Sequence, residues 1–167
     1  MSEIWELVDI YGNATGVVIE RNTNTRIPQN MYHIAVDIWV KRKDGKILLT
    51  QRHPNKEWGL QWECSGGAIV KGESISEGAQ RELQEETGIV VSLNDLQYLG
   101  KTIMQENQCI MYTYLVMLEE DMKLKLQKNE VIAAKWMEIE EIENMQEKIV
   151  KSVWARYLQF KEQIVKV

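Results

Sequence analysis

Residues 67–89 read GAIVKGESISEGAQRELQEETGI, and within this stretch the pattern of a loop gives way to the pattern of a helix. Ser74 and Glu77 have the three-residue spacing of a capping box, and Gly88 stands where a glycine commonly ends a helix. Three apolar residues recur at intervals of four and would face the core: Ile75, Ala79 and Leu83. The sequence therefore predicts one helix between Ser74 and Gly88, entered from a glycine-containing loop.

This predicted helix carries an excess of negative charge. Residues 73–86 contain five glutamates and one arginine, a local net charge of −4. Glu82, Glu85 and Glu86 fall within about 100° of one helix face, and like charges three or four residues apart repel each other. They also lie near the helix C-terminus, where the helix dipole disfavours anions. A solvated surface would explain an isolated Glu-Glu pair, but this spacing favours a bound cation.

A hard divalent cation would turn this repulsion into stabilisation. Mg²⁺ and Mn²⁺ prefer oxygen ligands and are held by a few carboxylates together with water and substrate phosphates. Gly66 and Gly67 fit the same interpretation, because a backbone without side chains can approach a metal or a phosphate and offer a carbonyl oxygen. We therefore expect Mg²⁺, or Mn²⁺ in its place, and a small substrate that contains phosphate.

The composition of the whole chain limits the classes of protein to consider. With 167 residues, of which 44% are apolar and 27% charged, the chain suits one globular domain over residues 1–167. The net charge of −5 argues against a nucleic-acid polymer as partner, since such a partner calls for a basic surface. Cys64 and Cys109 make no disulfide framework, so we expect a reducing compartment.

The sequence shows no pattern of a targeting or membrane-spanning segment. The first residues carry Glu3, Glu6 and Asp9, and no basic stretch leads into an apolar one as in a secretory signal. The longest mostly apolar run, Cys109–Leu118, is far shorter than the roughly 20 residues of a membrane helix. We expect a cytoplasmic protein that does not act at a membrane.

Strand-like segments surround the predicted helix. They are Trp5–Ile10, Val17–Arg21, His33–Val40, Lys46–Gln51, Leu96–Met104, Cys109–Leu118 and Lys135–Ile139. Asp44-Gly45 predicts a hairpin turn between two of them. A last helix is expected over residues 145–163, with a core-facing stripe of Ile149, Val150, Val153, Trp154, Tyr157 and Leu158. Because each apolar face needs a partner layer, these elements predict an α/β fold with helices on a mixed sheet.

The 23 residues from Gly67 to Ile89 resemble the Nudix box, GX5EX7REUXEEXGU, in which U is aliphatic. Every fixed position matches, namely Gly67, Glu73, Arg81, Glu82, Leu83, Glu85, Glu86, Gly88 and Ile89. The resemblance implies a Nudix-type α/β/α sandwich, with the box loop and helix at 66–89 and an N-terminal strand extension at 1–31. It also implies metal-assisted attack of water on phosphorus, cleaving a diphosphate in a nucleoside diphosphate derivative or another small organic diphosphate.

The resemblance further implies which residues bind metal and take part in catalysis. The family's metal ligands correspond to the carboxylates of Glu82, Glu85 and Glu86 and the backbone carbonyl of Gly66. Glu82 and Glu86 would therefore stand at the reacting phosphate. Bound cations would neutralise developing charge and lower the pKa of a bound water.

Other box positions would have supporting roles. Arg81 matches the arginine that orients a catalytic glutamate, although an ion pair along the helix would also explain it. Glu73 matches the residue that braces the loop on the helix, and Gly67 and Gly88 are structural.

The general base is the least determined part of the expected site. Glu130 is similar in position to a glutamate outside the box that activates the water in some family members, and an exposed loop glutamate is the equally weighted alternative. Glu106, between two late strands, is the competing candidate for the base.

Three residues outside the box are candidates for binding substrate. Arg52 could contact a phosphate, and the indole of Trp58 or Trp62 could stack on a base. Packing and an ordinary salt bridge explain these residues equally well.

The upstream part of the chain resembles the branch close to isopentenyl-diphosphate isomerase, because a strand pair precedes His33 and its apolar strand. Gly66 stands at the isomerase cysteine position, and Ala68 and Arg26 stand at histidine positions. Cys64 is two residues away, which we expect to turn its side chain or shift it out of register. Hydrolysis is therefore favoured over an isomerase-like activity. The intact box also favours hydrolysis over a non-catalytic nucleotide sensor, which has no need for all three helix carboxylates. A homodimer is common in the superfamily and is the expected assembly to test.

Overall fold

The computed structural model describes residues 3–22, 24, 26–119 and 122–166. Residues 1, 2, 23 and 25 of the expected N-terminal extension, and residues 120, 121 and 167, lie outside the described part. The strands are β1 Ile4–Val8, β2 Ala14–Glu20, β3 His33–Arg42, β4 Ile47–Arg52, β5 Trp62–Glu63, β6 Ser65–Ala68, β7 Gln97–Met104, β8 Cys109–Leu118 and β9 Val131–Met137. The α-helices are α1 Ile75–Thr87, α2 Ile139–Asn144 and α3 Lys151–Lys166, with single 3₁₀ turns at Leu93–Asp95 and Gln146–Lys148.

The sheet is mixed, as the sequence predicts. Seven strands run in the order β5-β4-β3-β8-β7, with β6 paired to β3 and β9 paired to β4. Strands β3 and β8 are parallel over ten residue pairs, whereas the other pairings in the sheet are antiparallel. The hairpin predicted at Asp44-Gly45 joins β3 to β4, and Gly45 has a φ of 89°. Strand β3 therefore lies at the centre of the sheet.

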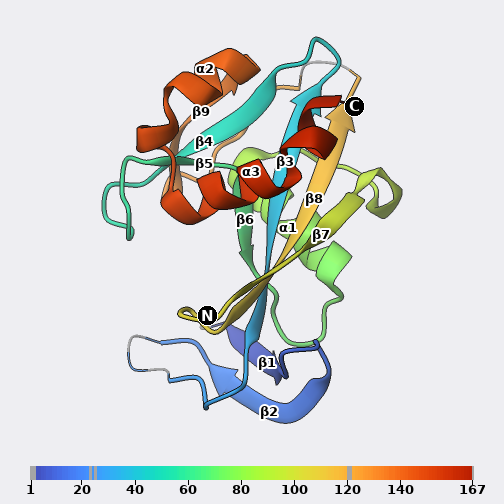
Figure 1. The fold of residues 1–167 in the computed structure, drawn as a ribbon, viewed down its shortest axis with the longest axis vertical. Coiled ribbons are helices and arrows are strands. Elements are labelled where there is room, and N and C mark those ends of the chain that lie inside the picture. The colour runs from blue at the N-terminus through green and yellow to red at the C-terminus, as the bar shows by residue number, and fades with distance from the viewer. Residues whose placement is uncertain (1–2, 23, 25, 120–121, 167) are drawn as a thin grey trace.

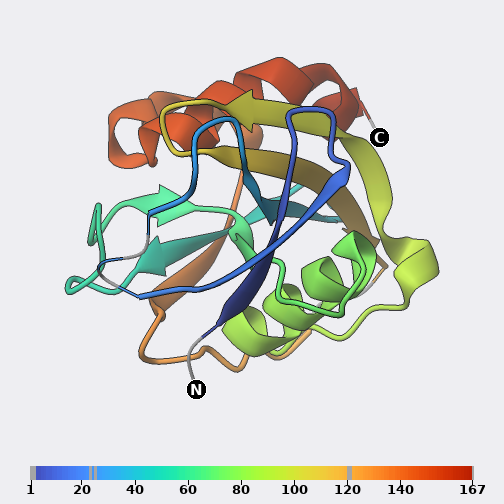
Figure 2. The same ribbon diagram turned by 90° about the horizontal axis from the view of Figure 1, so that it is seen from below.

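Helices cover both faces of this sheet, which confirms the predicted α/β/α sandwich. In Figure 2 α1 lies below the sheet and α3 lies above it. Alternate β3 side chains serve the two layers, because successive residues of a strand point to opposite faces. Val36, Ile38 and Val40 pack in the core with α1, whereas Trp39 packs in the core with α3.

Helix α1 has the boundaries that its caps predict. The Ser74 side chain accepts a hydrogen bond from the Glu77 N–H, and the Glu77 carboxylate accepts one from the Ser74 N–H. Gly88 ends the helix in the left-handed region, with a φ of 77°. Ala79 and Leu83 are fully buried in the core, as the four-residue spacing predicts.

The C-terminal segment differs from the single helix expected at 145–163. A short helix α2 forms first, and α3 begins only at Lys151. Ile149 and Val150 are buried but extended, because the Val150 N–H donates to the Trp62 carbonyl at 2.9 Å and ties the chain to β5. Leu158 is 54% exposed and does not belong to the core-facing stripe. The strand expected at Lys135–Ile139 begins earlier, as β9, and ends where α2 starts.

The strands β1 and β2 form a separate hairpin that packs against one end of the sheet (Figure 1). Trp5 and Leu7 of β1 form a small core with Ala68 of β6. The Trp5 ring also stacks on the His33 ring, with centroids 4.3 Å apart and an interplanar angle of 11°. This hairpin walls one end of the cavity described below. In the described part of the chain, no helix is long and apolar enough to span a membrane.

Candidate functional site

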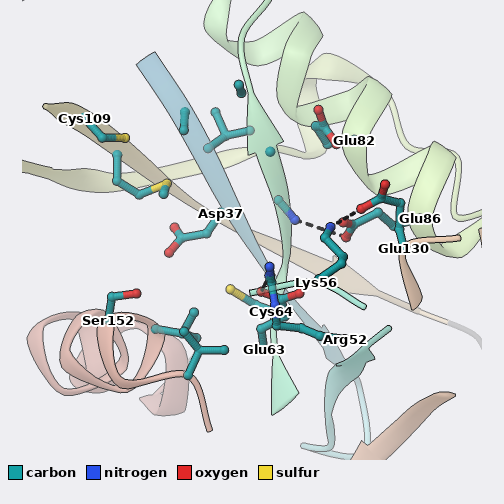
Figure 3. A pocket seen from close by; sticks show the side chains of 18 of the residues that line it. Asp37, Arg52, Lys56, Glu63, Cys64, Glu82, Glu86, Cys109, Glu130 and Ser152 are labelled. Atoms are coloured by element: carbon teal, nitrogen blue, oxygen red, sulfur yellow. Dashed lines mark hydrogen bonds and ion pairs between the residues drawn. The ribbon is translucent and has the colours of Figure 1, made fainter. Parts of the chain in front are cut away.

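One cavity, of about 530 Å³, runs between the sheet, α1, α3 and the β1–β2 hairpin. Its α1 end contains Glu82, Glu85 and Glu86, and its α3 end contains Asp37 and Arg156. Figure 3 shows Glu82 and Glu86 on the α1 side of β6, with Asp37 on the opposite side. We call these two regions the α1 end and the α3 end. The volume lies in the range typical of small-molecule sites.

Arg81 holds the acidic side chains of the α1 end in place. Its Nε and Nη2 donate to the two carboxylate oxygens of Glu73 at 3.0 and 2.7 Å, and its Nη1 donates to Glu82 at 2.7 Å and to Glu85 at 3.3 Å. Nη2 also donates to the Ala68 carbonyl at 3.0 Å, which ties the helix to β6. The planar guanidinium thus fixes one glutamate of the loop and two of the helix.

Gly67 makes room for the Glu82 carboxylate. A Cβ at position 67 would lie 2.3 to 2.5 Å from the Glu82 carboxyl carbon and oxygens. Burial raises the pKa of Glu82, and the hydrogen bond from Arg81 opposes this effect. The carboxylate is thus pressed between the β6 backbone and the guanidinium at the wall of the cavity.

Glu86 is the most buried carboxylate of the α1 end, with 5% of the residue exposed. Its Oε2 accepts a hydrogen bond from the Gly66 N–H at 3.2 Å. Burial raises the pKa of Glu86 well above its usual value, and the nearby negative charges of Glu63 and Glu82 raise it further. The Lys56 ammonium partly compensates. Negative charge is therefore concentrated at this point of the cavity.

Glu63 and Lys56 belong to this site although the sequence patterns did not single them out. Glu63 lies in β5, and its carboxylate accepts a hydrogen bond from Arg52 at 2.6 Å. Burial raises the pKa of Glu63, and Arg52 opposes this effect. Lys56, in the loop after β4, forms an ion pair with Glu130. Neither segment has a residue spacing that would have predicted these contacts.

The two candidates for the general base occupy different positions. Glu130 precedes β9 and lines the cavity, where Figure 3 shows it beside Lys56 and Glu86. Glu106 lies in the turn between β7 and β8 and does not line the cavity. The structure therefore brings Glu130, and not Glu106, to the carboxylates of the box.

Two of the three candidate substrate-binding residues line the cavity, and the third does not. Arg52 lines the cavity, but its guanidinium also donates to the Glu57 carbonyl at 2.8 Å and is held there by Glu63. Trp58 lines the cavity and is 48% exposed. Trp62 does not line it; its ring packs with the α3-side core because β5 turns it away. The expectation that Trp62 lies at the substrate pocket is therefore corrected.

The arrangement of the box agrees with comparisons to known proteins. The family model of the NUDIX domain matches residues 31–157, which is more than half of the chain. The chain belongs to the Nudix hydrolase family. Nudix hydrolases act on diphosphate bonds, and the residues matched include all the carboxylates of the α1 end named above.

Relatives of this Nudix hydrolase resemble it over most of its length. An uncharacterized Nudix hydrolase of Listeria monocytogenes is 28% identical over 84% of this chain and 83% of its own. The DR0079 structure from Deinococcus radiodurans has a TM-score of 0.77 at 17% identity, covering 95% of this chain and 99% of that one. The NUDIX domain of Shewanella oneidensis NrtR, complexed with ADP ribose, has a TM-score of 0.67 at 18% identity, covering 86% and 94%. The chain spans less than half the length of the Arabidopsis thaliana Nudix hydrolases it also matches.

The Nudix box carboxylates suit a cation that takes few protein ligands. Within residues 3–22, 24, 26–119 and 122–166, no three His, Cys, Asp or Glu side chains form a ready-made metal cage. Arg81 holds Glu82 and Glu85, while the Gly66 N–H holds Glu86. Mg²⁺ is commonly held by one or two carboxylates plus water and substrate phosphates, so this donor set fits it.

Cys64 does not lie where we expect it. Instead of turning away, it lines the same cavity as Gly66, because residues two apart in an extended chain point to the same face. Burial raises the pKa of the Cys64 thiol well above its usual value, and Asp37 adds to this effect. Burial thus disfavours the thiolate, which is the nucleophilic form of cysteine.

Proposed function

We propose that this Nudix hydrolase is a metal-dependent enzyme that cleaves a diphosphate bond in a nucleoside diphosphate derivative or another small organic diphosphate, by attack of water on phosphorus. The observation that carries the proposal is the buried Glu86 carboxylate beside Glu82 and Glu63. Such a concentration of negative charge is unfavourable for folding alone. It is stabilised when a divalent cation and a phosphate substrate bind.

In this proposal Glu82, Glu85 and Glu86 hold the cation, together with the Gly66 carbonyl. Bound Mg²⁺ or Mn²⁺ supplies Lewis-acid polarisation of the diphosphate and lowers the pKa of a water. Arg81 fixes the orientation of Glu82 through the 2.7 Å contact, so the carboxylate needs little rearrangement when substrate arrives.

Glu130 is the proposed general base, because it is the candidate that reaches the cavity. Its ion pair with Lys56 holds the carboxylate at the cavity, where it can accept a proton from the attacking water. Lys56 is also placed to neutralise charge on a phosphate, since it lines the cavity between Glu130 and Glu86. Arg52 and Trp58 are proposed to contact the substrate at the opening of the cavity.

The fold neighbours support part of the proposed substrate class. One of them, at 18% identity, is complexed with ADP ribose, which supports including that compound among the substrates tested. Free, buried cysteines at positions 64 and 109 support the further proposal of a cytoplasmic location, because thiols persist in a reducing compartment.

The test is a screen of product release with Mg²⁺ and with Mn²⁺. The panel contains ADP-ribose, nucleoside diphosphate sugars, nucleoside triphosphates and alkyl diphosphates. We expect at least one to be hydrolysed, and Glu86→Gln to reduce that turnover by at least about 1000-fold. We also expect Mg²⁺ to raise the thermal unfolding temperature of the wild type and to leave that of Glu86→Gln unchanged.

Glu77→Gln is the matched control for this variant. Glu77 lies on the same helix but serves only the capping box, in which glutamine is also accepted. Wild-type turnover in Glu86→Gln, or an equal loss in Glu77→Gln, would contradict the metal assignment.

Two further measurements separate the competing functions. Deuterium uptake into isopentenyl diphosphate in deuterated water would reveal an isomerase-like reaction, whereas hydrolysis releases phosphate without exchange at carbon. Tight binding of a nucleotide without any phosphate or nucleotide product would instead reveal a non-catalytic sensor.

A further inference from the structure

The α3 end of the cavity contains a buried ion pair that the proposed chemistry does not use. Asp37 of β3 and Arg156 of α3 pair through Oδ2 and Nε, and each side chain is only 4% exposed. Both residues line the cavity that contains Glu82 and Glu86. Figure 3 shows Asp37 pointing into the space between β3 and α3.

One oxygen of this pair has no partner. Asp37 Oδ1 is buried and accepts no hydrogen bond from the part of the chain that the structure describes. Thr113, which stands in register with Asp37 on β8, makes no hydrogen bond to it, and its own Oγ1 is also unpartnered among the described residues. A buried polar atom without a partner is unfavourable, and such atoms are rare in folded proteins. The oxygen is covered by its neighbours, so a ligand donor reaches it when a neighbouring side chain moves aside.

Arg156 presents donors beside this acceptor. Its Nε is occupied by Asp37, while its Nη1 lies 3.5 Å from the sulfur of Met104, which is a weak acceptor. The remaining guanidinium N–H groups are available to a stronger acceptor. One free acceptor thus lies next to free donors, which matches a planar ligand edge that carries an N–H next to a carbonyl oxygen or a ring nitrogen.

The walls around the pair are mostly apolar and polarisable. They are formed by Ala35, Met104, Cys109, Met111 and Val153, and Ser152 of α3 adds one hydroxyl to the lining. Such walls accept the flat face of a ring, since thioethers make favourable contacts with aromatic groups. A prenyl chain would leave Asp37 Oδ1 without a donor. A sugar diol would place polar hydroxyls against these apolar walls.

We propose that Asp37 and Arg156 form a nucleobase subsite, in which Asp37 Oδ1 accepts a hydrogen bond from an N–H of the base and Arg156 donates to the neighbouring acceptor. The subsite rests on the proposed diphosphate hydrolysis, and it narrows the substrate to nucleoside diphosphate derivatives. The diphosphate lies at the α1 end of the same cavity and the base at the α3 end.

The test measures binding without turnover. Calorimetric titrations without divalent cations use AMP, GMP, CMP and UMP, and ribose 5-phosphate as the ligand that lacks a base. We expect at least one nucleotide to bind wild type at least about 10-fold more tightly than ribose 5-phosphate. The subsite is refuted if no nucleotide binds better than ribose 5-phosphate.

The variant is Asp37→Leu/Arg156→Met, which removes both charges together and leaves no unpaired buried charge. Exchanging a buried ion pair for apolar residues of similar volume is often neutral for stability. We expect this variant to bind the nucleotide no better than ribose 5-phosphate. Tyr157→Phe is the control on α3, because its hydroxyl bonds Glu143 outside the cavity, and it should retain the preference. A base preference that survives the double variant would also refute the subsite.

Asp37→Asn provides a second variant that keeps the shape of the side chain. Its amide oxygen can still accept from Arg156, while its amide nitrogen would donate where Asp37 Oδ1 accepts. We expect the order of preference among the four nucleotides to change. An unchanged order would contradict direct contact between Asp37 and the base.

Turnover separates this inference from the proposed function. If nucleotides bind through Asp37 but no diphosphate is hydrolysed, the subsite stands and the hydrolase proposal fails. If wild type and Asp37→Leu/Arg156→Met hydrolyse a nucleoside diphosphate derivative equally well, the hydrolase proposal stands and the subsite fails.

Discussion

The two ends of the cavity are built in opposite ways. At the α1 end, Arg81 contacts Glu73, Glu82 and Glu85, all within one short stretch of chain. At the α3 end, the Arg156 guanidinium meets a carboxylate 119 residues earlier in the sequence. The first arrangement follows from the pitch of one helix and its loop. The second exists only after β3 and α3 have packed together.

Because of this difference, the residues proposed for the chemical step and the residues proposed to recognise the substrate can change independently. The box residues proposed to hold the cation lie close together in sequence, so they are fixed relative to each other by α1 and its loop. The residues proposed to choose the substrate come from elements far apart, so they can vary while α1 stays the same. One scaffold can thus keep a reaction and change its substrate.

Among the variants that test this comparison, the largest effect should come from Glu130, which joins the α1 end from far outside the box. We expect Glu130→Gln to lower kcat about 100-fold or more with little change in KM, because the amide cannot take a proton from water. Steady-state kinetics on the best substrate of the panel measures this.

Glu106→Gln is the companion variant. Since Glu106 does not line the cavity, its kcat should match that of the wild type. Equal losses in both variants, or none in Glu130→Gln, would remove Glu130 as the base and leave the α1 end to the box alone.

A smaller effect is expected within the α1 end from Arg81→Lys, which keeps the charge. An ammonium cannot reproduce the paired contacts to Glu73 while also reaching Glu82. We expect kcat to fall about 10-fold and the free energy of unfolding to fall by about 1 to 2 kcal/mol. Kinetics and chemical denaturation test both expectations.

Arg42→Lys is the control, because Arg42 also contacts a carboxylate through two of its guanidinium nitrogens. Arg42 contacts Asp44 through Nε and Nη2 at the β3–β4 turn and does not line the cavity. Unchanged kcat in Arg42→Lys with reduced kcat in Arg81→Lys would show that the Arg81 network positions the carboxylates. Equal kcat in both variants would contradict it.

The smallest effect concerns His33, which lines the cavity beside the β1–β2 hairpin. Burial under Trp5 lowers the pKa of His33, and Arg21 lowers it further, while the Gln108 carbonyl and Glu3 oppose this. The unfolded chain therefore binds a proton before the folded protein does as the pH falls below about 6.5, so His33 destabilises the fold there. Between pH 7 and 5.5 the wild type should lose more stability than His33→Gln, with an upper limit of about 1 kcal/mol set by the titration of the unfolded chain.

Urea denaturation at several pH values measures this difference, with His53→Gln as the control for a histidine in a loop. A wild-type pH dependence in His33→Gln would show that the histidine does not titrate in this window. Turnover should change little in either variant.

The sequence predicts the α1 end well because its signals are local. Ser74, Glu77 and Gly88 bound the helix through hydrogen bonds within a few residues, and the spacing of the glutamates fixes their common face. The α3 end is not predictable in this way. Arg156 lies in a segment whose apolar spacing directs attention to Leu158, yet Arg156 is buried and Leu158 is exposed.

The boundary of the last helix shows the same limit. Helical spacing includes Ile149 and Val150, but a hydrogen bond to Trp62 of β5 keeps both extended. Trp62 itself was expected at the cavity and packs against α3 instead. Each of these corrections depends on a contact between distant segments, which periodicity along the chain does not contain.

The close approach of Gly67 to the Glu82 carboxylate couples the side-chain volumes at these two positions. Gly67 does not have the positive φ that would demand glycine, so the limit at this position is the volume of the facing side chain. A methyl group at position 67 would displace the end of the Glu82 side chain from its 2.7 Å contact with Arg81. The absent side chain of one residue thus determines where the carboxylate of another lies.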